Sequence, residues 1–295
     1  MKTAEFHRQV ADKIIAAMQD SGTDWCKCWT PIGGHAPTSI VTDNPYSGIN
    51  VLILGLTRMA KGWQSNYYGT FKSWRAKGYS VAKGEKATHI VWYGSGSRKV
   101  QNEDGTEDSV GWRSAKAYAV FNAEQVTDTR LGRKGLSFTD GVEQAPEFTK
   151  QADTAMDKLA CDVGVDVRNV DLSQAFYVPS ADYVNTPHIE QFDSAEAYAC
   201  TLGHEMCHWT GHTSRLDRKK DNYAFEELVA EIGAAMLAAS LGISATPRAD
   251  HAKYLNGWIK DIGDKPTTII SAAAKAQAAA NYLLQSQAEQ VGLAA

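Results

Sequence analysis

The sequence predicts an α+β fold in two domains, a small α+β domain followed by a mainly helical domain with a short sheet. Apolar residues recur every four positions in several segments, which is the period of an amphipathic helix. Segments 87–94 and 116–122 have instead the β-branched and aromatic content of strands. The charge divides as well, because residues 1–137 hold 18 Lys and Arg against 12 Asp and Glu, whereas residues 138–295 hold 12 against 22. Glycines, charges and a proline interrupt residues 130–146, so we place the domain boundary after residue 137.

The first domain begins with an amphipathic helix in "EFHRQVADKIIAAMQ", where the apolar positions are Phe6, Val10, Ile14 and Met18. A loop with prolines and glycines follows, and "SGINVLILGLTRMAKG" reads as a second, buried helix. "TFKSWRAKGY" predicts a short helix capped by Thr70. The two strand segments complete a small sheet. The alanine-rich stretch Ser271–Ala280 of the second domain predicts a packing helix.

The chain carries no sign of a membrane or secreted protein. No run approaches the roughly 18 apolar residues that a bilayer span needs, and no apolar signal-peptide core follows Lys2. The five cysteines form an odd, scattered set, which suits a reducing compartment. We expect a soluble, cytoplasmic protein.

Residues 44–99 have the composition of a nucleic-acid-binding surface. They hold nine Lys and Arg against the single acid Glu85, interleaved with nine aromatic residues. Cations that follow a phosphate backbone and flat rings that stack on bases are what single-stranded nucleic acid binding requires. The alternative is that the aromatic residues form core and the lysines a solvated face. The candidate DNA-binding residues are Tyr46, Lys72, Trp74, Arg75, Lys77, Lys83, Lys86, Trp92 and Tyr93.

The motif His204-Glu205-x-x-His208 indicates a metal site. Its two imidazoles are four residues apart and therefore share one helix face, where both can reach one ion. Glu205 directly follows the first histidine and can take a proton from a water on the metal, which is the zincin arrangement of a hydrolase. With Ser194 as a candidate N-cap and Gly211 as a stop, we predict a helix from about 195 to 210. Upstream, "DYVNTPHIEQF" reads as an edge strand to which a peptide substrate could add.

A catalytic zinc needs a third protein ligand. The metzincin pattern would place a third histidine at position 214, which is Ser214. The following helical segment, "DNYAFEELVAEIGAAMLAASLG", instead carries three acids. Glu226 is explained as a partner of the helix dipole. Glu227 and Glu231 lie four apart on one face, so we predict that Glu227 binds the metal and Glu231 orients a histidine, with the reverse assignment open. The two histidines and the glutamate favour Zn²⁺, and Mn²⁺ or Co²⁺ could replace it in vitro.

The chain resembles the ArdC-type antirestriction proteins of conjugative plasmids. The stretches that carry the resemblance are "NPYSGINVLIL", "YGTFKSWRAKGYSVAKGEKATHIVWYG", "AYAVFNAEQV", "LGHEMCHWTGHTSRLDR" and "YAFEELVAEIGAAML". The resemblance implies a single-stranded-DNA-binding domain, here 1–137, joined to a zincin-like metallopeptidase domain, here 138–295. It also implies a role in protecting incoming plasmid DNA from host restriction. His204, Glu205, His208 and Glu227 match the motif positions of the family.

Three functional hypotheses follow. The chain is an antirestriction protein that binds single-stranded DNA and carries a working zinc metallopeptidase with an unknown protein substrate. Alternatively, it is a DNA-binding shield with a non-catalytic metal site, or a DNA-tethered peptidase that cleaves DNA-bound proteins. The intact Glu205 argues against the shield, because a structural metal site needs ligands but no general base.

Overall fold

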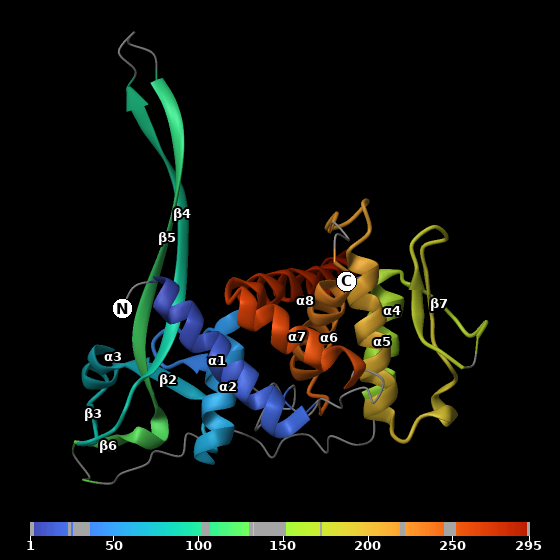
Figure 1. Ribbon diagram of the computed structural model, residues 1–295. Helices are drawn as coiled ribbons and strands as arrows, with labels where there is room; N and C mark the ends of the chain where they lie inside the picture. The colour runs from blue at the N-terminus through green and yellow to red at the C-terminus, as the bar shows by residue number, and fades with distance from the viewer. Residues whose placement is uncertain are drawn as a thin grey trace.

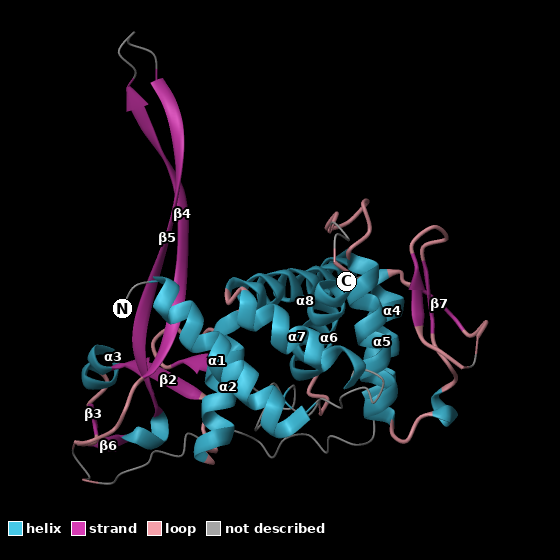
Figure 2. Cartoon of the chain, in the orientation of Figure 1, coloured by secondary structure: helices cyan, strands magenta, loops and turns pink. Residues whose placement is uncertain are grey.

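The α+β class is confirmed. The computed structural model describes residues 3–22, 25, 36–101, 107–129, 132, 152–171, 173–218, 222–244 and 252–293, with the side chains of 3, 93–101, 107–115, 152, 252–253 and 286–293 outside that description. A body of helices lies beside a small sheet, from which a long hairpin projects (Figures 1 and 2). The predicted boundary after residue 137 lies outside the described residues.

The first helix, α1 (Thr3–Ser21), packs against elements of both halves of the chain. Its predicted apolar stripe is buried, with Phe6, Val10, Ile14 and Met18 each at most 3% exposed. The stripe belongs to the same core as Trp258 and Ile262 of α7 (Ala252–Asp264). Arg8 Nη1 also donates to the carbonyl of Gly263 at 2.6 Å. The N-terminal helix is therefore packed on the C-terminal half rather than on its own sheet alone.

The N-terminal sheet has the strand order β1-β2-β5-β4, with β1 and β2 parallel and the other pairs antiparallel. These strands are β1 (Thr38–Ser39), β2 (Tyr67–Thr70), β4 (Thr88–Gln101) and β5 (Glu107–Asn122). The buried helix α2 (Ile49–Lys61) lies beside β4. The short helix α3 (Phe71–Ala76) is capped as predicted, because Thr70 Oγ1 accepts from the Ser73 amide at 3.1 Å. Next to it, β3 (Tyr79–Val81) pairs with β6 (Val126–Asp128), which follows the turn η2 (Ala123–Gln125).

The β4–β5 hairpin is longer than the sequence predicts. Its strands run for 14 and 16 residues, paired from Thr88 opposite Val120 to Gln101 opposite Glu107. The stretch "SGSRKVQ" has too few apolar residues to show the alternation of a half-buried strand, so the predicted strand stopped at Gly94. At the base of the hairpin, Asn50 Nδ2 donates to the Val91 carbonyl at 2.7 Å and Asn50 Oδ1 accepts from the Val91 backbone N–H at 2.9 Å, which covers the outer edge of β4.

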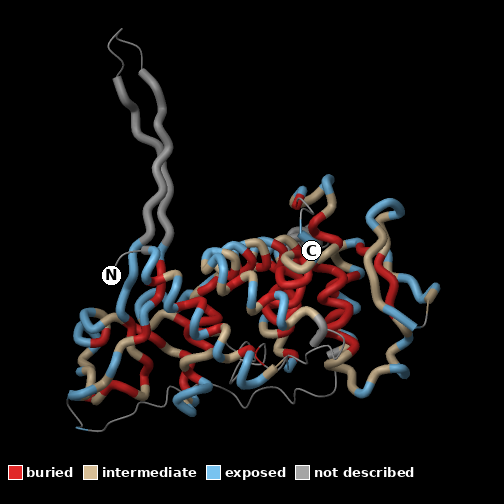
Figure 3. The backbone as a smooth tube through the Cα atoms, in the orientation of Figure 1, coloured by how far each residue is buried: buried red, intermediate tan, exposed pale blue. Residues whose placement is uncertain are grey.

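The C-terminal half is a helical body around α6. It contains α4 (Ala152–Val163), α5 (Ala195–Thr210), α6 (Tyr223–Ser240), α7 and α8 (Thr267–Leu293). Helix α6 packs against both α5 and α8, and residues 226–238 are buried without interruption. Figure 3 shows this continuous burial at the centre of the body. The predicted packing role of the alanine-rich segment is confirmed, since Ala272, Ala273, Ala276, Ala279 and Ala280 are buried.

The predicted edge strand upstream of α5 is wrong. Strand β9 (Tyr183–Asn185) is the middle strand of a sheet ordered β7-β9-β8, with β7 (Asp166–Arg168) parallel to it and β8 (Phe176–Val178) antiparallel. Both edges of β9 are therefore already hydrogen-bonded, and no peptide can add to it. The turn η3 (Ile189–Gln191) then leads towards α5. Among the described residues, no helix is both long and apolar enough to cross a bilayer.

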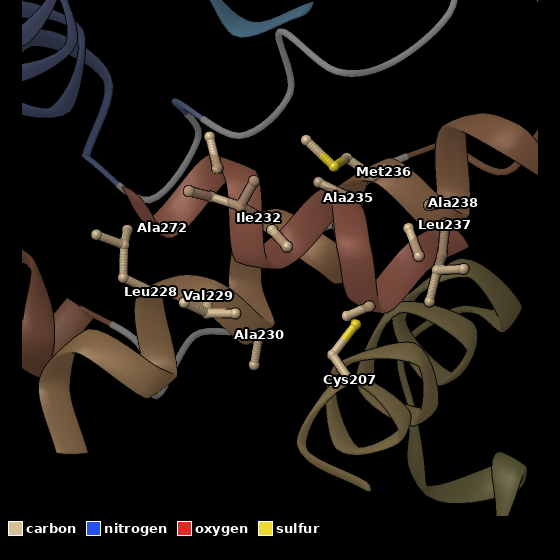
Figure 4. Packing of buried hydrophobic residues seen from close by; sticks show 14 of the residues in the cluster. Cys207, Leu228, Val229, Ala230, Ile232, Ala235, Met236, Leu237, Ala238 and Ala272 are labelled. Atoms are coloured by element: carbon tan, nitrogen blue, oxygen red, sulfur yellow. The ribbon is translucent and has the colours of Figure 1, made fainter. Parts of the chain in front are cut away.

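A glycine allows α5 and α6 to approach closely. Cys207 of α5 is fully buried, and Figure 4 shows it among the apolar side chains of α6. A Cβ atom added to Gly233 of α6 would lie 2.6 Å from Cys207 Sγ. Any larger residue at position 233 would push apart the two helices that carry the candidate site.

We therefore expect Gly233→Ala to destabilise the protein by about 1–3 kcal/mol, the usual cost of overpacking a core. Urea unfolding followed by circular dichroism measures this change. Gly257→Ala in α7 is the matched control, because a Cβ there meets nothing within 4 Å. That variant should be neutral or more stable by up to about 1 kcal/mol, since Ala favours a helix over Gly. Equal effects of the two substitutions would contradict the close approach.

Candidate functional site

Helix α5 presents the two histidines of the motif side by side. It runs from Ala195 to Thr210, as predicted, and Ser194 caps it by accepting from the Ala197 amide at 3.1 Å. His204 is 1% exposed, whereas the side chain of His208 is 13% exposed. Their Nε2 atoms lie 3.0 Å apart, and the rings meet edge to face. The two nitrogens converge on one point, as two ligands of one ion would.

Helix α6 brings the carboxylate of Glu227 to the same point. Its first turn is fixed by Asn222, whose side chain accepts from the Phe225 amide at 3.2 Å. The two Glu227 oxygens lie 3.5 Å from His204 Nε2 and 3.4 Å from His208 Nε2. Donors bound about 2.0–2.1 Å from a tetrahedral zinc are about 3.3 Å from one another. The shortest distances among the three residues are close to this value, with a different Glu227 oxygen facing each histidine. Their chemistry suits a divalent metal.

Glu231 lies on the other side of His204. Its carboxylate oxygen is 3.6 Å from His204 Nδ1, while Glu227 faces Nε2. A carboxylate beside the second ring nitrogen of a ligating histidine fixes its tautomer and orientation. This placement favours Glu227 as the third ligand and Glu231 as the orienting group, rather than the reverse.

Glu226 has a partner that the sequence did not reveal. It lies in the first helical turn, as predicted, but is buried rather than solvated, and accepts from Arg218 Nη2 at 2.7 Å. Arg218 also donates to Thr210 Oγ1 at 2.7 Å and to the Cys207 carbonyl. Glu226 Oε1 is 3.6 Å from His208 Nδ1, which mirrors Glu231 at His204. The sequence does not predict this ion pair, because a separation of eight residues across the connection between two helices does not fix whether the side chains meet.

Gly211 explains how this arginine fits. It is the C-cap of α5, as predicted, but with a right-handed φ of −76°, so glycine is not needed there for a left-handed turn. A Cβ at this position would instead lie 2.9 Å from Arg218 Nη2. The absence of a side chain makes room for the guanidinium against the end of the helix.

The buried acids control the protonation of the site. Burial opposes the charged form of His208, but hydrogen bonds to Glu226 and Glu227 and the charge of Glu205 outweigh it and raise the pKa of His208 to about 9. Burial also acts against ionised Glu227, yet its hydrogen bonds with His204 and His208 hold the pKa of that carboxyl far below its usual range. Glu205 is 4% exposed. The metal-free site therefore holds a protonated His208 at neutral pH.

Metal binding should consequently release protons. A histidine ligates through its neutral form, so a metal that binds at pH 7 must displace the proton of His208. We expect the affinity for zinc to rise with pH up to about 9, the pKa of His208. Calorimetric titration at pH 7 in two buffers of different ionisation enthalpy should show about one proton released per zinc. A heat that is independent of the buffer would contradict this protonation state.

Other residues near the motif have structural partners. His212 Nδ1 lies 2.7 Å from Ser214 Oγ, in the turn after α5. Arg215 stacks its guanidinium over the Trp209 ring at 3.7 Å and donates to Asp182 Oδ2 at 3.0 Å. This contact fastens the β8–β9 turn to the end of α5. Within the described part of the chain, His204, His208 and Glu227 form the group that could hold an ion.

The structure places all five candidate DNA-binding cations on the surface and corrects part of the aromatic set. Exposed residues are Lys72, Arg75, Lys77, Lys83, Lys86 and, at 47%, Trp92. Trp74 is wrong as a stacking residue, because it is fully buried and donates to the Phe121 carbonyl at 2.9 Å. Tyr46 is half-buried with its ring edge to face with Tyr68, and the side chain of Tyr93 lies outside the described residues.

Three further exposed residues of the N-terminal half were not among the predicted DNA-binding residues. Phe71 is 52% and Tyr118 43% exposed, and Lys116 is exposed as well. Trp92 pairs with Lys116 across the hairpin and Ile90 with Tyr118, so Trp92 and Tyr118 are diagonal neighbours on one face. Tyr118 and Lys116 lie beyond the basic segment 44–99, and only the strand register brings them to Trp92.

Two protein families match separate parts of the chain, one in the basic N-terminal half and one in the acidic C-terminal half. Residues 4–121 match the N-terminal domain of anti-restriction factor ArdC, and residues 154–275 match a zincin-like metallopeptidase family. Two proteins named DNA primase TraC from Escherichia coli are 32% identical over 97% of this chain. This chain spans only 28% and 20% of their lengths. The uncharacterized protein y4eC of Sinorhizobium fredii is 30% identical over 97% of this chain and 93% of its own length.

The fold is similar to crystal structures of the antirestriction protein ArdC from plasmid R388. The metal-free form superposes with a TM-score of 0.77 at 36% identity, covering 96% of this chain and 98% of that one. The Mn(II)-bound form gives a TM-score of 0.76 at 34% identity, covering 98% and 99%. Both domains and nearly the full length of the chain match, so this chain belongs to the ArdC antirestriction family, with an ArdC N-terminal domain followed by a zincin-like metallopeptidase domain.

Proposed function

We propose that this chain is a zinc-dependent peptidase joined to a surface for single-stranded DNA, and that it protects incoming DNA from host restriction. The observation that carries the peptidase is the spacing of the His204, His208 and Glu227 donors, 3.0–3.5 Å, with Glu205 on the same helix. The antirestriction role rests on the family. A relative binds Mn(II), and the two imidazoles and one carboxylate here suit zinc as well.

The residues of the site have separate roles in this proposal. A divalent metal held by His204, His208 and Glu227 would supply an activated water and polarise the peptide carbonyl. Glu205 takes a proton from the attacking water on its carboxylate and delivers it to the leaving amine nitrogen. Glu231 and Glu226 keep the ring nitrogens of the histidines oriented. The buried base distinguishes this site from a structural metal site, which favours the peptidase over a DNA-binding shield.

For DNA, the cations on α3 and after it support a backbone contact. Lys72, Arg75 and Lys77 are all exposed on or directly after α3. Trp92, Tyr118 and Lys116 share one face of the hairpin base, where two rings could stack on bases beside a cation. Arg58, which contributes to the basic composition of the segment, is buried and belongs to the interior.

Replacing Lys72, Arg75 and Lys77 together by Ala should weaken binding of single-stranded DNA and reduce its salt dependence. Each lost phosphate contact lowers the slope of log affinity against log salt by about 0.7 for single strands. Fluorescence anisotropy with a labelled oligonucleotide at several salt concentrations measures it. The matched control is a triple Ala substitution at Lys158, Lys260 and Lys265, exposed lysines of the C-terminal half. An unchanged slope in the first variant would rule out this surface.

A further inference from the structure

Different helices cover the two faces of the N-terminal sheet. Val120 of β5 and Ile90 of β4 are buried in one cluster with Leu54 of α2. Phe121, the next residue of β5, packs against the cluster around Trp74 of α3, and its carbonyl accepts from Trp74 Nε1 at 2.9 Å. Successive residues of a strand point to opposite faces. Helices α2 and α3 therefore lie on opposite faces of the sheet, as Figure 1 shows on either side of β2.

The exposed rings of the hairpin base lie on the α2 face. Tyr118 comes two residues before Val120 on β5, and Trp92 comes two residues after Ile90 on β4. The two strands pair residue for residue here, with Lys116 opposite Trp92. Because residues two apart on a strand share a face, Trp92, Tyr118 and Lys116 continue the face that α2 covers further down the sheet.

The cations proposed to bind the DNA backbone lie on the other face. Lys72, Arg75 and Lys77 are exposed on or directly after α3. The sheet itself lies between α3 and the face that carries Trp92 and Tyr118. A strand with its bases stacked on the two rings would have to pass round an edge of the sheet to reach these cations.

The ring pair has its own cation and the chemistry of a base-stacking surface. Trp92 is 47% and Tyr118 43% exposed, and they are diagonal neighbours on paired strands, which fixes their backbones relative to each other. Lys116 is exposed directly opposite Trp92. Segments 88–92 and 116–120 contain no acid. Flat rings beside a cation are what binds the bases and phosphates of a single strand.

The backbone around the rings favours a nucleic acid over an added protein strand. Asn50 of α2 binds both the N–H and the carbonyl of Val91, so another strand cannot pair with the outer edge of β4 at this level. The same contacts place the first turn of α2, which has no acid, next to Trp92. The positive end of a helix dipole favours an anionic ligand. Charge and shape thus both suit a single strand.

Helix α2 connects this face to the C-terminal half. The Gly48 N–H at its start donates to Gln277 Oε1 of α8 at 2.9 Å. Leu52 of α2 also belongs to the same core as Ala276 of α8. The side of the sheet that carries the rings is therefore the side on which the helical body lies, whereas α3 lies on the side away from it (Figure 1).

We propose that Trp92, Tyr118 and Lys116 form a second nucleic-acid site, separate from the cations of α3, which holds unpaired bases on the side of the sheet that faces the helical body. The inference rests on the proposed function, in which both surfaces bind single-stranded DNA. With two sites, one chain holds two short strands at once, or two separated segments of one long strand.

Counting bound strands tests the inference. Calorimetric titration of the full-length, zinc-loaded protein with an oligothymidylate of about six nucleotides, near the lower end of known site sizes, should give two strands per chain. Trp92→Ala combined with Tyr118→Ala should leave one strand, bound with the salt dependence of the α3 cations. The triple Ala substitution at Lys72, Arg75 and Lys77 should also leave one strand, with a smaller salt dependence.

Further variants separate stacking from a general effect on the fold. Replacing two stacking rings by Ala should weaken binding at their site by about 5- to 100-fold or more, whereas Trp92→Phe with Tyr118→Phe keeps flat rings and should still bind two strands. Met59→Ala is the control, because Met59 of α2 is 46% exposed in the same half, and it should also bind two. A 5-iodouracil base in the oligonucleotide should photocrosslink to Trp92 or Tyr118 in the wild type.

Three results would overturn the second site alone. A single strand per wild-type chain that both the ring and the cation variants abolish would mean one continuous site. Two strands retained by the Ala ring variant would remove the rings from binding. A wild-type dimer that the Ala ring variant dissociates would assign the rings to a second copy of the chain. A folded, zinc-loaded wild type that binds no oligonucleotide would instead overturn the DNA-binding part of the proposed function, and this inference with it.

Discussion

Glu205→Gln should abolish peptide cleavage while the protein still binds zinc and DNA. Glu205 is 4% exposed and follows His204 directly on α5, and it is absent from the donor group formed by His204, His208 and Glu227. Gln has the same shape but cannot take a proton from water. Removing a positioned general base lowers a rate by about 100- to 10,000-fold.

The measurement is the appearance of new peptide N-termini, identified by mass spectrometry, in casein incubated with the zinc-loaded protein. Running it with and without single-stranded DNA also separates the functions, because stimulation by DNA would favour a peptidase that acts on DNA-bound proteins. Zinc content and oligonucleotide affinity are determined on the same samples as controls. Cleavage by zinc-loaded Glu205→Gln at the wild-type rate would exclude Glu205 as the base.

His204→Ala should lose the metal. In the proposed site His204 supplies one of three protein donors, and it lies between Glu227 at Nε2 and Glu231 at Nδ1. Removing even a group that only orients a ligand lowers metal affinity by about 10- to 100-fold, so removal of the ligand itself should exceed about 100-fold. Because the substitution also leaves Glu227 and Glu231 buried without His204, thermal unfolding should show a less stable protein.

Glu231→Gln separates the loss of a residue that orients a ligand from the loss of the ligand itself. Glu231 lies 3.6 Å from Nδ1 of His204 and is not a proposed ligand, so its loss should weaken zinc binding less than the loss of His204. Competition with a chelator ranks the two variants. If Glu231→Gln lost more affinity than Glu227→Gln, the assignment of these two glutamates would have to be reversed.

The local features of the site could be predicted from the sequence. The bounds of α5, its Ser194 cap and the shared face of His204 and His208 all follow from short-range spacing. The segment after it was predicted as a helix for the same reason, and its face with Glu227 and Glu231 does turn towards the histidines. Whether these residues hold a metal remains a prediction.

The features that were missed depend on contacts between distant segments. Arg218 reaches Glu226 only because Gly211 leaves space at the end of α5. Strand β9 is too short to show by its own residues that it has partners on both sides. Trp74 has the sequence context of a surface ring, and it is buried because α3 packs between β2 and β3. The length of the β4–β5 hairpin was missed since its outer part lacks an apolar alternation.

X-ray absorption at the zinc edge shows whether His204, His208 and Glu227 bind one zinc ion. We expect about one zinc per chain, with two imidazole nitrogens and oxygen ligands at about 2.0–2.1 Å and no sulfur ligand. The signal should disappear in His204→Ala. A sulfur shell at about 2.3 Å would place the metal on cysteines instead, and a protein that takes up no stoichiometric zinc would contradict the claim altogether.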